Sequence, residues 1–377
     1  MAKNRNLFRL TRLVLLKLPR LFRLFAKFRK PEKRLLIIKT DAIGDYILFR
    51  NFISIVNHSE KYKGYEIHLM GNKLWKEIVL NYDINYINKV FLINPDDLYY
   101  SPLKTLKLGW HLFRKNYLVV LHPTHARTLI ADGLAGLTAA KQIIGFDGDN
   151  QRILAKYKVK TDKFYTERLY HPESLSFEFD RSKFFFETIL KKSIEINGPT
   201  IPVYSTIKNG IIIFPGAGVV KRSWKMDNFL ALIKLIQQQT SQPVYLAGGP
   251  SEIGIGSYLE ENLPRGSVVN KIGKTSLPQL IELIGEASLV IANETSAIHI
   301  AAATKTNAVC ILGGGHFERF APYPEYIINK PACVYEKLEC YYCNWNCKFI
   351  TKEDEPYPCI SVVSLETVWD TVQSFIS

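Results

Sequence analysis

A polar turn at residues 293–296 is the feature of the sequence with the clearest chemical meaning. It lies inside residues 289–303, between an apolar run typical of a buried strand and an Ala-rich stretch that predicts a helix. In a parallel sheet, ligands bind beyond the carboxyl ends of the strands, where the next helix N-terminus attracts anions. Thr295 and Ser296 offer hydroxyl groups to a phosphate, whereas Glu294 suits a sugar hydroxyl. The turn predicts a ligand with both phosphate and sugar, unless these residues only cap the helix.

Glycine turns follow other predicted strands in the same half of the chain. They involve Gly216, Gly248, Gly313 and Gly314. Glycine lets the backbone approach a phosphate closely, although no single one of these turns is specific. Lys221 and Arg222 follow the first turn, and together with Lys225 they carry enough charge to neutralise a diphosphate. The alternative for this run is a solvated cluster at a helix start.

A second set of polar residues follows strands predicted in the first half. Asp41 and Asp45 flank Gly44 after the apolar run 35–39. Asp45 suits a general base that takes a proton from an acceptor hydroxyl, or a simple helix cap. Three further side chains follow the predicted strand 118–121 and fit either an anionic acceptor or a capped loop. They are His122, His125 and Arg127.

Alternating apolar runs and helical stretches must position these residues, and they predict an α/β fold with doubly wound parallel sheets. Strands are predicted at 35–39, 65–70, 90–93, 118–121, 141–146, 211–214, 244–247, 289–292 and 309–312. Helices are predicted at 46–56, 176–190, 226–239 and 277–284, among others. The length of 377 residues favours two domains, and we divide the chain near residue 198 into two Rossmann-like halves with a cleft between them.

The positive charge of the chain is concentrated at its N-terminus. The net charge is +14, and residues 1–34 contain twelve Lys or Arg and one acid. The rest of the chain is nearly balanced, which argues against a nucleic-acid partner. Residues 5–28 alternate Leu and Phe with cations at helical spacing, so we expect residues 1–30 to lie on an anionic membrane surface, with a kink at Pro19. The alternative is a helix packed on the body of the protein.

Nothing else in the sequence resembles a membrane span or a cleavable signal, which predicts a cytoplasmic protein, peripheral at the membrane.

A cluster of cysteines lies near the C-terminus, at Cys340, Cys343, Cys347 and Cys359, shortly after Cys333. Four thiolates at this spacing suit a structural zinc ion, and they leave no open position for a catalytic one. Reduced, packed thiols are the main alternative, and redox or disulfide roles are less expected in the cytosol.

Several of these segments, in their order along the chain, resemble glycosyltransferase family 9, the heptosyltransferase family of lipopolysaccharide core assembly. The resembling segments are 37–45, 214–217, 221–224, 246–249 and 293–303, within a match of about 34–375. The resemblance implies a GT-B fold, with an acceptor domain at 34–197 and a nucleotide-sugar domain at 198–377 that includes the Cys-rich segment 333–359. The basic amphipathic arm at 1–33 precedes these two domains. The same resemblance implies an inverting, metal-independent transfer without a catalytic cofactor.

The resemblance also implies roles for single residues. Asp45 matches the catalytic aspartate, and Lys221 or Arg222 matches the phosphate-binding lysine, although the family more often has Lys-Arg-Trp-Pro here. Glu294 and Ser296 stand where the family more commonly has aspartate and glycine, a difference that concerns the donor more than the reaction type. The remaining donor residues are Gly216, Gly248, Thr295, His299, Gly313 and Gly314, and the acceptor residues are Asp41, Gly44, His125 and Arg127.

The expected partners are a nucleoside-diphosphate sugar, an anionic lipid-linked glycan and the inner face of the cytoplasmic membrane. We expect a sugar, with heptose as a candidate, to be moved to a lipopolysaccharide core or a related acceptor. A non-catalytic nucleotide-sugar-binding scaffold is the alternative. A nicotinamide-dependent oxidoreductase is disfavoured, because the sequence has no complete Gly-x-Gly-x-x-Gly element with a ribose-binding acid.

Overall fold

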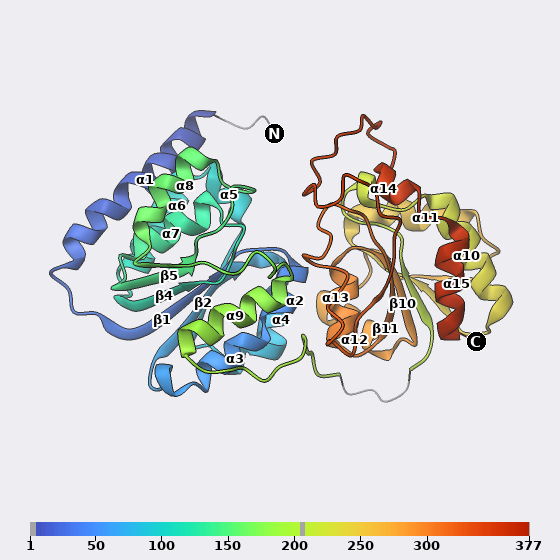
Figure 1. The fold of residues 1–377 in the computed structure, drawn as a ribbon, viewed down its shortest axis with the longest axis horizontal. Helices are drawn as coiled ribbons and strands as arrows, with labels where there is room; N and C mark the ends of the chain where they lie inside the picture. The colour runs from blue at the N-terminus through green and yellow to red at the C-terminus, as the bar shows by residue number, and fades with distance from the viewer. Residues whose placement is uncertain (1–4, 204–207, 377) are drawn as a thin grey trace. The chain divides into compact units, whose positions relative to one another are not determined.

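The computed structural model describes residues 5–203 and 208–376, and it divides the chain into two compact units. Unit 1 comprises Met1–Leu175 and Asp180–Ile194, and unit 2 comprises Ser176–Phe179 and Glu195–Ser377. Each unit contains a six-stranded sheet in which every pairing between neighbouring strands is parallel (Figure 1). Helices flank both sheets, so the predicted α/β class is confirmed.

The sheet of unit 1 has the strand order β3-β2-β1-β4-β5-β6. Its strands are β1 (Glu32–Lys39), β2 (Glu66–Asn72), β3 (Lys89–Ile93), β4 (Tyr117–His122), β5 (Gln142–Phe146) and β6 (Glu167–Leu169). The α-helices around it are α1 (Arg5–Ala26), α2 (Ile43–Phe49), α3 (Asn51–Asn57), α4 (Lys76–Ile78), α5 (Pro95–Tyr99), α6 (Pro102–Phe113), α7 (Leu129–Thr138), α8 (Ala155–Thr161) and α9 (Glu178–Leu190). Strands β1 and β4 lie at the centre, so the loops that follow them leave the middle of the sheet.

Alternate residues of the central strands supply two hydrophobic cores. Leu36 and Ile38 of β1 belong to a buried cluster with residues of α1, α6 and α7. Because side chains alternate along a strand, Leu35 and Ile37 face the other side of the sheet. Helices α3 and α9 contact each other through the rings of Phe52 and Phe186, which stack with centroids 5.3 Å apart.

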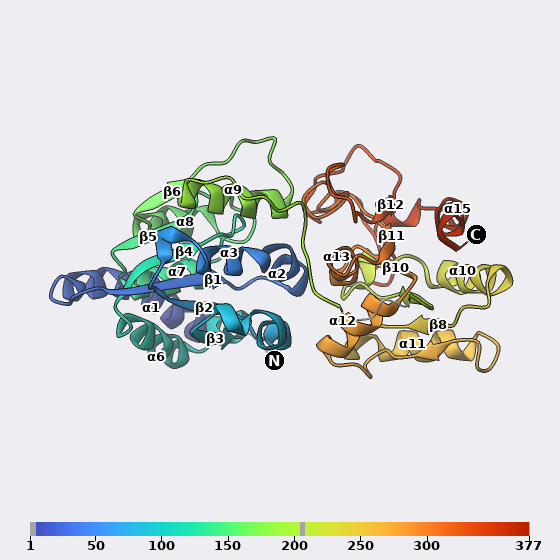
Figure 2. The same ribbon diagram turned by 90° about the horizontal axis from the view of Figure 1, so that it is seen from below.

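The sheet of unit 2 has the order β12-β11-β10-β7-β8-β9. Its strands are β7 (Ile211–Phe214), β8 (Val244–Leu246), β9 (Val269–Asn270), β10 (Leu289–Asn293), β11 (Asn307–Ile311) and β12 (Ala332–Val334). Its helices are α10 (Met226–Gln239), α11 (Ile253–Glu261), α12 (Leu277–Glu286), α13 (Ser296–Ala303), α14 (Pro358–Ser361) and α15 (Leu365–Ile376) (Figure 2). Counted within each unit, both sheets have the order 3-2-1-4-5-6, which is the Rossmann arrangement.

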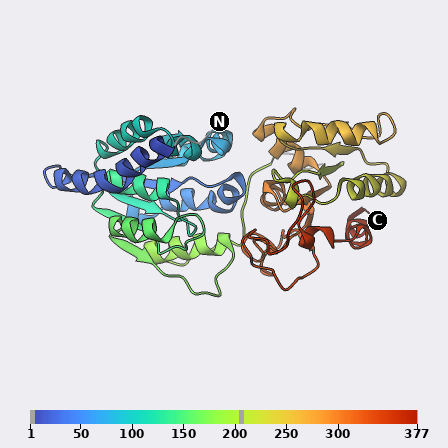
Figure 3. The same cartoon turned by 90° about the horizontal axis from the view of Figure 1, so that it is seen from above.

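The N-terminal helix differs from the expectation of a separate arm. Helix α1 contacts α5, α6 and α7 of unit 1, and its position beside them can be followed in Figure 3. Leu15, Leu16 and Phe22 are buried in the same core cluster as the central strands. The helix continues through Pro19. It therefore belongs to the body of unit 1, because one of its faces is apolar enough to join the core, while the opposite face stays exposed.

Candidate functional site

The loop after β1 contains an acidic residue, Asp41, whose negative charge is balanced by cations of the same unit. The carboxylate of Asp41 accepts a hydrogen bond from Thr124 Oγ1 at 2.9 Å and lies 3.0 Å from Lys39 Nζ. Burial acts to raise the pKa of Asp41, but Lys39 and Arg152 outweigh it and the pKa is lowered. Asp41 is therefore ionised, and it joins the loop after β1 to the loop after β4. Its predicted contact with an acceptor stays a prediction.

Asp45 lies in the first turn of α2 and is partly exposed. The N-cap of this helix is Ala42, with no side-chain capping bond, so Asp45 is not the N-cap residue. Gly44, also partly exposed, precedes it in the same turn. Asp45 is thus held at the carboxyl edge of the sheet on a helix start, where a carboxylate is favoured by the helix dipole.

The next residue, Tyr46, fixes this helix start. Its ring stacks on Trp75 with centroids 3.9 Å apart, and its hydroxyl donates to Asp83 Oδ2 at 2.7 Å. Trp75 in turn donates from Nε1 to the carbonyl oxygen of Asp41 at 3.0 Å. The indole lies so close to Gly71 that a Cβ there would meet the ring at 1.6 Å. The backbone around Asp45 is therefore locked by buried contacts that sequence patterns did not reveal.

His122 at the end of β4 belongs to an internal network. The hydroxyl of Tyr165 donates to Asp132 Oδ1 at 2.6 Å and lies 2.7 Å from Nδ1 of His122. Since that hydroxyl proton is already used, Nδ1–H of His122 must donate to the Tyr165 oxygen. Burial, followed by the charge of Arg127, lowers the pKa of His122 to about 3, so the ring is neutral.

The two residues predicted to meet the acceptor beyond β4 differ in access. Arg127 is fully buried, and it donates to the carbonyl oxygen of Phe146 at 3.2 Å and to Asp162. Its guanidinium is held inside unit 1, so the predicted acceptor contact is at odds with its burial. His125 is partly exposed, and its Nδ1 lies 3.4 Å from Asp149 Oδ2. The acceptor role of His125 stays a prediction.

In unit 2, the buried Asn293 at the end of β10 organises the loop after β7. Its Nδ2 donates to the carbonyl oxygens of Pro215 at 3.0 Å and Gly216 at 3.2 Å. Its Oδ1 accepts from the backbone N–H of Trp224 at 2.9 Å. The segment that contains the two predicted donor cations is therefore anchored at both ends by one amide side chain, a role that no sequence pattern indicated.

A carboxylate from the chain itself bridges two glycine turns. Glu252 accepts from the backbone N–H of Gly218 at 3.2 Å and of Gly249 at 2.8 Å. A Cβ on Gly216 would meet this carboxylate at 2.0 Å, and one on Gly248 at 2.4 Å. Both predicted glycines are thus needed to admit Glu252. The signal in the sequence was a glutamate three residues after a helix start, which reaches back as in a capping box.

The turn after β10 is the most chemically distinctive part of unit 2. Thr295 is the N-cap of α13, and its Oγ1 accepts from the backbone N–H of Ala297 at 3.3 Å. Ser296, which begins the helix, is partly exposed. Oε2 of Glu294 is buried and has no hydrogen-bond partner among the described residues. Burial raises the pKa of Glu294 to about 8, against the opposing charges of Arg222 and Arg319.

His299, three residues into the same helix, is an interior residue. It is 4% exposed, and its Nδ1 lies 2.7 Å from the hydroxyl of Tyr323. Burial lowers the pKa of His299 to about 3. The ring is therefore a neutral group packed beside Tyr323, and its donor role stays a prediction.

The two predicted donor cations contact the Cys-rich segment. Lys221 Nζ donates to the carbonyl oxygen and to Oγ1 of Thr351, both at 3.1 Å. The guanidinium of Arg222 lies over the ring of Trp345, 4.3 Å from its centroid. Arg222 is also the charge that most strongly opposes the raised pKa of Glu294. The structure thus brings Arg222, Glu294 and the start of α13 together at one edge of the sheet.

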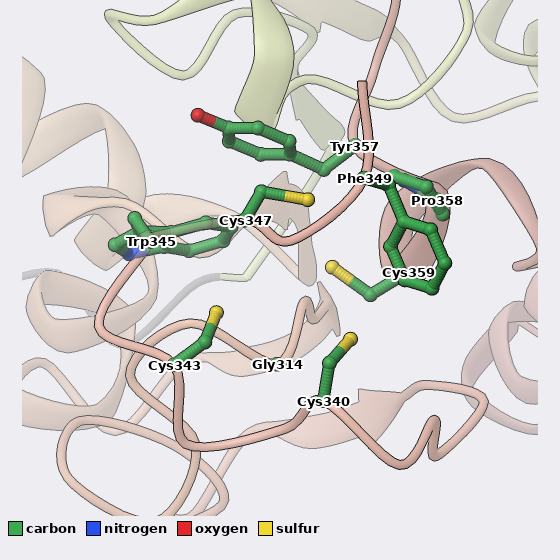
Figure 4. Close-up of a pocket in the computed structure, with 9 residues that line it drawn as sticks. All are labelled: Gly314, Cys340, Cys343, Trp345, Cys347, Phe349, Tyr357, Pro358 and Cys359. Carbon is green, nitrogen blue, oxygen red and sulfur yellow. The ribbon is translucent and has the colours of Figure 1, made fainter. Parts of the chain in front are cut away.

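The glycines after β11 are covered by aromatic rings. A Cβ on Gly314 would meet the ring of Tyr341 at 2.3 Å, and one on Gly313 would meet Ile360 at 2.6 Å and Trp345 at 2.9 Å. These contacts within the protein are enough to require glycine at both positions, so a ligand is not needed to explain the two glycines. Gly314 also lines a cavity with the four predicted metal ligands, Cys340, Cys343, Cys347 and Cys359 (Figure 4).

Comparisons with known proteins agree with this arrangement. The model of glycosyltransferase family 9 (heptosyltransferase) matches residues 134–343, more than half of the chain. Lipopolysaccharide heptosyltransferase 3 of Escherichia coli K12 is 33% identical over 132 residues, which span 34% of this chain and 38% of that relative.

Two solved structures share the fold over almost the whole chain. A family 9 glycosyltransferase from Veillonella parvula has a TM-score of 0.68 and 15% identity, with 92% of this chain and 97% of that chain covered. The E. coli heptosyltransferase WaaC, solved with ADP-2-deoxy-2-fluoro heptose, has a TM-score of 0.63 and 15% identity, with 90% and 99% covered. These neighbours support the predicted GT-B fold.

Proposed function

Because the chain belongs to glycosyltransferase family 9, we propose that it transfers a sugar from a nucleoside-diphosphate donor to a lipopolysaccharide core or a related lipid-linked glycan. ADP-heptose is the first donor candidate, since the matching relatives are named as heptosyltransferases and one neighbour was solved with an ADP-heptose analogue. The alternative of a non-catalytic scaffold is not favoured by these relatives.

The observation that carries the proposal is the buried, unpartnered Oε2 of Glu294 beside the start of α13. An unpartnered buried acceptor is costly unless a ligand completes its hydrogen bonds. A sugar hydroxyl would do so, while Thr295, Ser296 and the helix N-terminus face the negative charge of a diphosphate. Arg222 adds a positive charge close to the same carboxyl group. These groups together fit a ligand with both sugar and diphosphate.

In the proposed reaction, unit 1 supplies the base. The carboxylate of Asp45 takes the proton of an acceptor hydroxyl, and the hydroxyl oxygen attacks the anomeric carbon of the donor. The bond from that carbon to the diphosphate oxygen breaks, and the electron pair leaves with the nucleoside diphosphate. Attack from the opposite face inverts the anomeric centre. Lys221 and Arg222 stabilise the leaving charge, so this mechanism requires no metal ion.

The donor assignment is tested by thermal-shift measurements with ADP-heptose, ADP, ADP-glucose and UDP-glucose. A ligand that binds the native state at 100 times its Kd adds about 2.7 kcal/mol to stability. We expect ADP-heptose to raise the melting temperature most and ADP to raise it less. If no nucleotide sugar shifts the melting temperature or binds in calorimetry, the proposed function is wrong.

The proposal includes attachment to the inner face of the cytoplasmic membrane through α1. No helix among the described residues is long and apolar enough to cross a membrane. Helix α1 nevertheless exposes a stripe of large apolar side chains on the face away from the core, and Phe28 follows it. The stripe consists of Leu10, Leu13, Leu21, Leu24 and Phe25, each about half exposed. Exposed cations flank the stripe, namely Arg5, Arg9, Arg20 and Lys27. This composition suits anionic lipid headgroups.

Outward-facing substitutions test this attachment better than a truncation, because Leu15 and Phe22 are part of the core of unit 1. We expect the triple change Leu13→Glu, Leu24→Glu, Phe25→Glu to abolish co-sedimentation with phosphatidylglycerol-containing vesicles at low salt. Ile253→Glu, at an exposed position on α11, is the matched control and should leave binding intact. Unchanged sedimentation of the triple variant would exclude α1 as the attachment site.

A further inference from the structure

Four thiols of the Cys-rich segment line one small cavity in unit 2. They are Cys340, Cys343, Cys347 and Cys359, and we refer to them as the cysteine cluster. Figure 4 shows their sulfur atoms directed into the same space. The cavity volume is about 10 Å³, which is roughly the space of one water-sized sphere. All six cysteines of the chain are free thiols.

The chemistry of this cavity is that of a thiolate site. Its other lining residues are glycine, proline and aromatic side chains, so no carboxylate or imidazole competes with the sulfur atoms. Among the described residues, no group of three or more His, Cys, Asp or Glu side chains is already arranged to hold a metal ion. Rotation about χ1, which has three staggered positions in cysteine, is the movement that would draw the sulfur atoms of the cluster together.

The segment that carries the cluster has little regular structure to hold it. Residues 335–357, between β12 and α14, contain neither helix nor strand. Tyr342, Asn344 and Trp345 have φ angles of 66°, 50° and 63°, a left-handed conformation that is unfavourable for residues other than glycine. These three residues lie between Cys340 and Cys347. A crosslink at the cysteine cluster would hold this turn in place.

We propose that the cysteine cluster binds one tetrahedral metal ion, with Zn²⁺ as its metal, and that this ion fixes the Cys-rich segment. Four thiolates at about 2.3 Å form a closed structural site in which no coordination position is left for substrate. The thiols lose their protons to solvent on binding, so metal affinity falls at low pH. The ion therefore has a structural role and takes no part in the transfer reaction.

The same segment contacts the proposed donor cations, which connects the metal site to the proposed function. The backbone N–H of Tyr357 donates to the carbonyl oxygen of Lys221 at 2.8 Å. Thr351 accepts from the side chain of Lys221, and Trp345 lies under Arg222. Release of the metal ion should therefore weaken donor binding without removing any group that contacts the donor. This second step rests on the proposed function, whereas metal binding does not.

Metal content of the intact protein tests the site directly. We expect about one equivalent of zinc per chain after purification in the presence of Zn²⁺, and less than a tenth of that in Cys343→Ser. Cys333→Ser is the matched control, because Cys333 lies in the same part of the chain but does not line the cavity. Equal zinc contents in the two variants, or no bound zinc in the wild type, would overturn the proposal.

A second measurement does not depend on how well the variants fold. Wild-type protein exchanged with Co²⁺ should show the visible absorption of tetrahedral cobalt and near-ultraviolet sulfur-to-cobalt charge transfer. Octahedral cobalt absorption, or alkylation data that show the cluster paired in disulfides, would contradict a tetrathiolate site. Donor affinity, measured by calorimetry, should fall at least tenfold in Cys343→Ser. An unchanged affinity in a zinc-free variant would refute the connection to the donor site, whereas absence of donor binding in the wild type would refute only the proposed function.

Discussion

Two sheets with the same strand order end in very different polar groups. In unit 1, Lys39 lies 3.0 Å from Asp41 and Arg127 lies 3.5 Å from Asp132, so these two buried carboxyl groups each have a cation of the same unit as a partner. In unit 2, the buried Oε2 of Glu294 has no hydrogen-bond partner among the described residues. The same strand order therefore accompanies paired carboxyl groups in unit 1 and a carboxyl oxygen without a hydrogen-bond partner in unit 2.

This difference separates residues that hold the fold from residues that suit a ligand. Internal ion pairs of the first kind lose stability when one partner is removed. A carboxyl group with a buried oxygen that lacks a hydrogen-bond partner should behave in the opposite way, because its substitution relieves a desolvation cost. Substituting one carboxyl group in each unit should thus give opposite results, and the predictions below test that contrast.

The largest effect is expected in the buried network of unit 1. Asp132 accepts from Thr161 Oγ1 and from the Tyr165 hydroxyl, both at 2.6 Å, and lies near Arg127. Asp132→Ala leaves these partners unpaired in the interior, so it should lower the free energy of unfolding by about 3–5 kcal/mol. Urea unfolding measures this loss. Asp97→Ala, at an exposed position, is the control, and a loss below about 1 kcal/mol would show that the network adds little stability.

An intermediate effect is expected for donor binding in unit 2. Arg222→Ala removes a charged donor, which should cost about 1.5–3 kcal/mol in affinity for ADP-heptose, or roughly a 10- to 100-fold rise in Kd. Arg222→Lys should recover part of this loss. An exposed cation elsewhere on α10, Lys234, provides the control, since Lys234→Ala should leave the Kd within about twofold. Calorimetry that gives equal Kd values for Arg222→Ala and the wild type would remove Arg222 from the donor site.

The third prediction is a pH dependence of stability set by Glu294. Its pKa is raised from 4.5 to about 8 in the folded protein, so the folded state binds this proton more tightly than the unfolded state. The free energy of unfolding should therefore decrease as the pH rises from about 4.5 through about 8. Glu294→Gln lacks this decrease, so its melting temperature should exceed that of the wild type at pH 9 and match it more closely at pH 6.

The exposed Glu282 serves as a reference for this experiment. Glu282→Gln should follow the wild type at both pH values. If Glu294→Gln melts below the wild type at pH 9, the carboxylate has a stabilising partner, and the contrast between the two units disappears.

Regular elements could be predicted where apolar runs were long. Strands β1, β4, β7 and β10 lie where the apolar runs predicted them, and α10 begins and ends at the predicted residues. The strands without a predicted counterpart, β6, β9 and β12, contain three, two and three residues. Such short segments at or near the edges of a sheet bury too few side chains to leave a pattern.

The positions of the site residues could be predicted better than their contacts. Spacing placed Asp45 at the helix start that follows β1 and Glu294 directly after β10, and both are there. Spacing gave no sign that the Glu252 carboxylate would also accept from the backbone N–H of Gly218, or that Asn293 would anchor the loop after β7. Those contacts join residues that are 34 to 78 positions apart in the chain, so they depend on the tertiary fold and leave no local pattern.

Transfer by the Asp45→Asn variant is the most direct test of the account. With ADP-heptose and a truncated lipopolysaccharide core, product formation followed by mass spectrometry should fall by about 10²- to 10⁴-fold, as expected for loss of a general base. Donor affinity should be unchanged, and Asp97→Asn, also in the first turn of a helix, should transfer at the wild-type rate. Wild-type transfer by Asp45→Asn would contradict the assignment of Asp45 as the base.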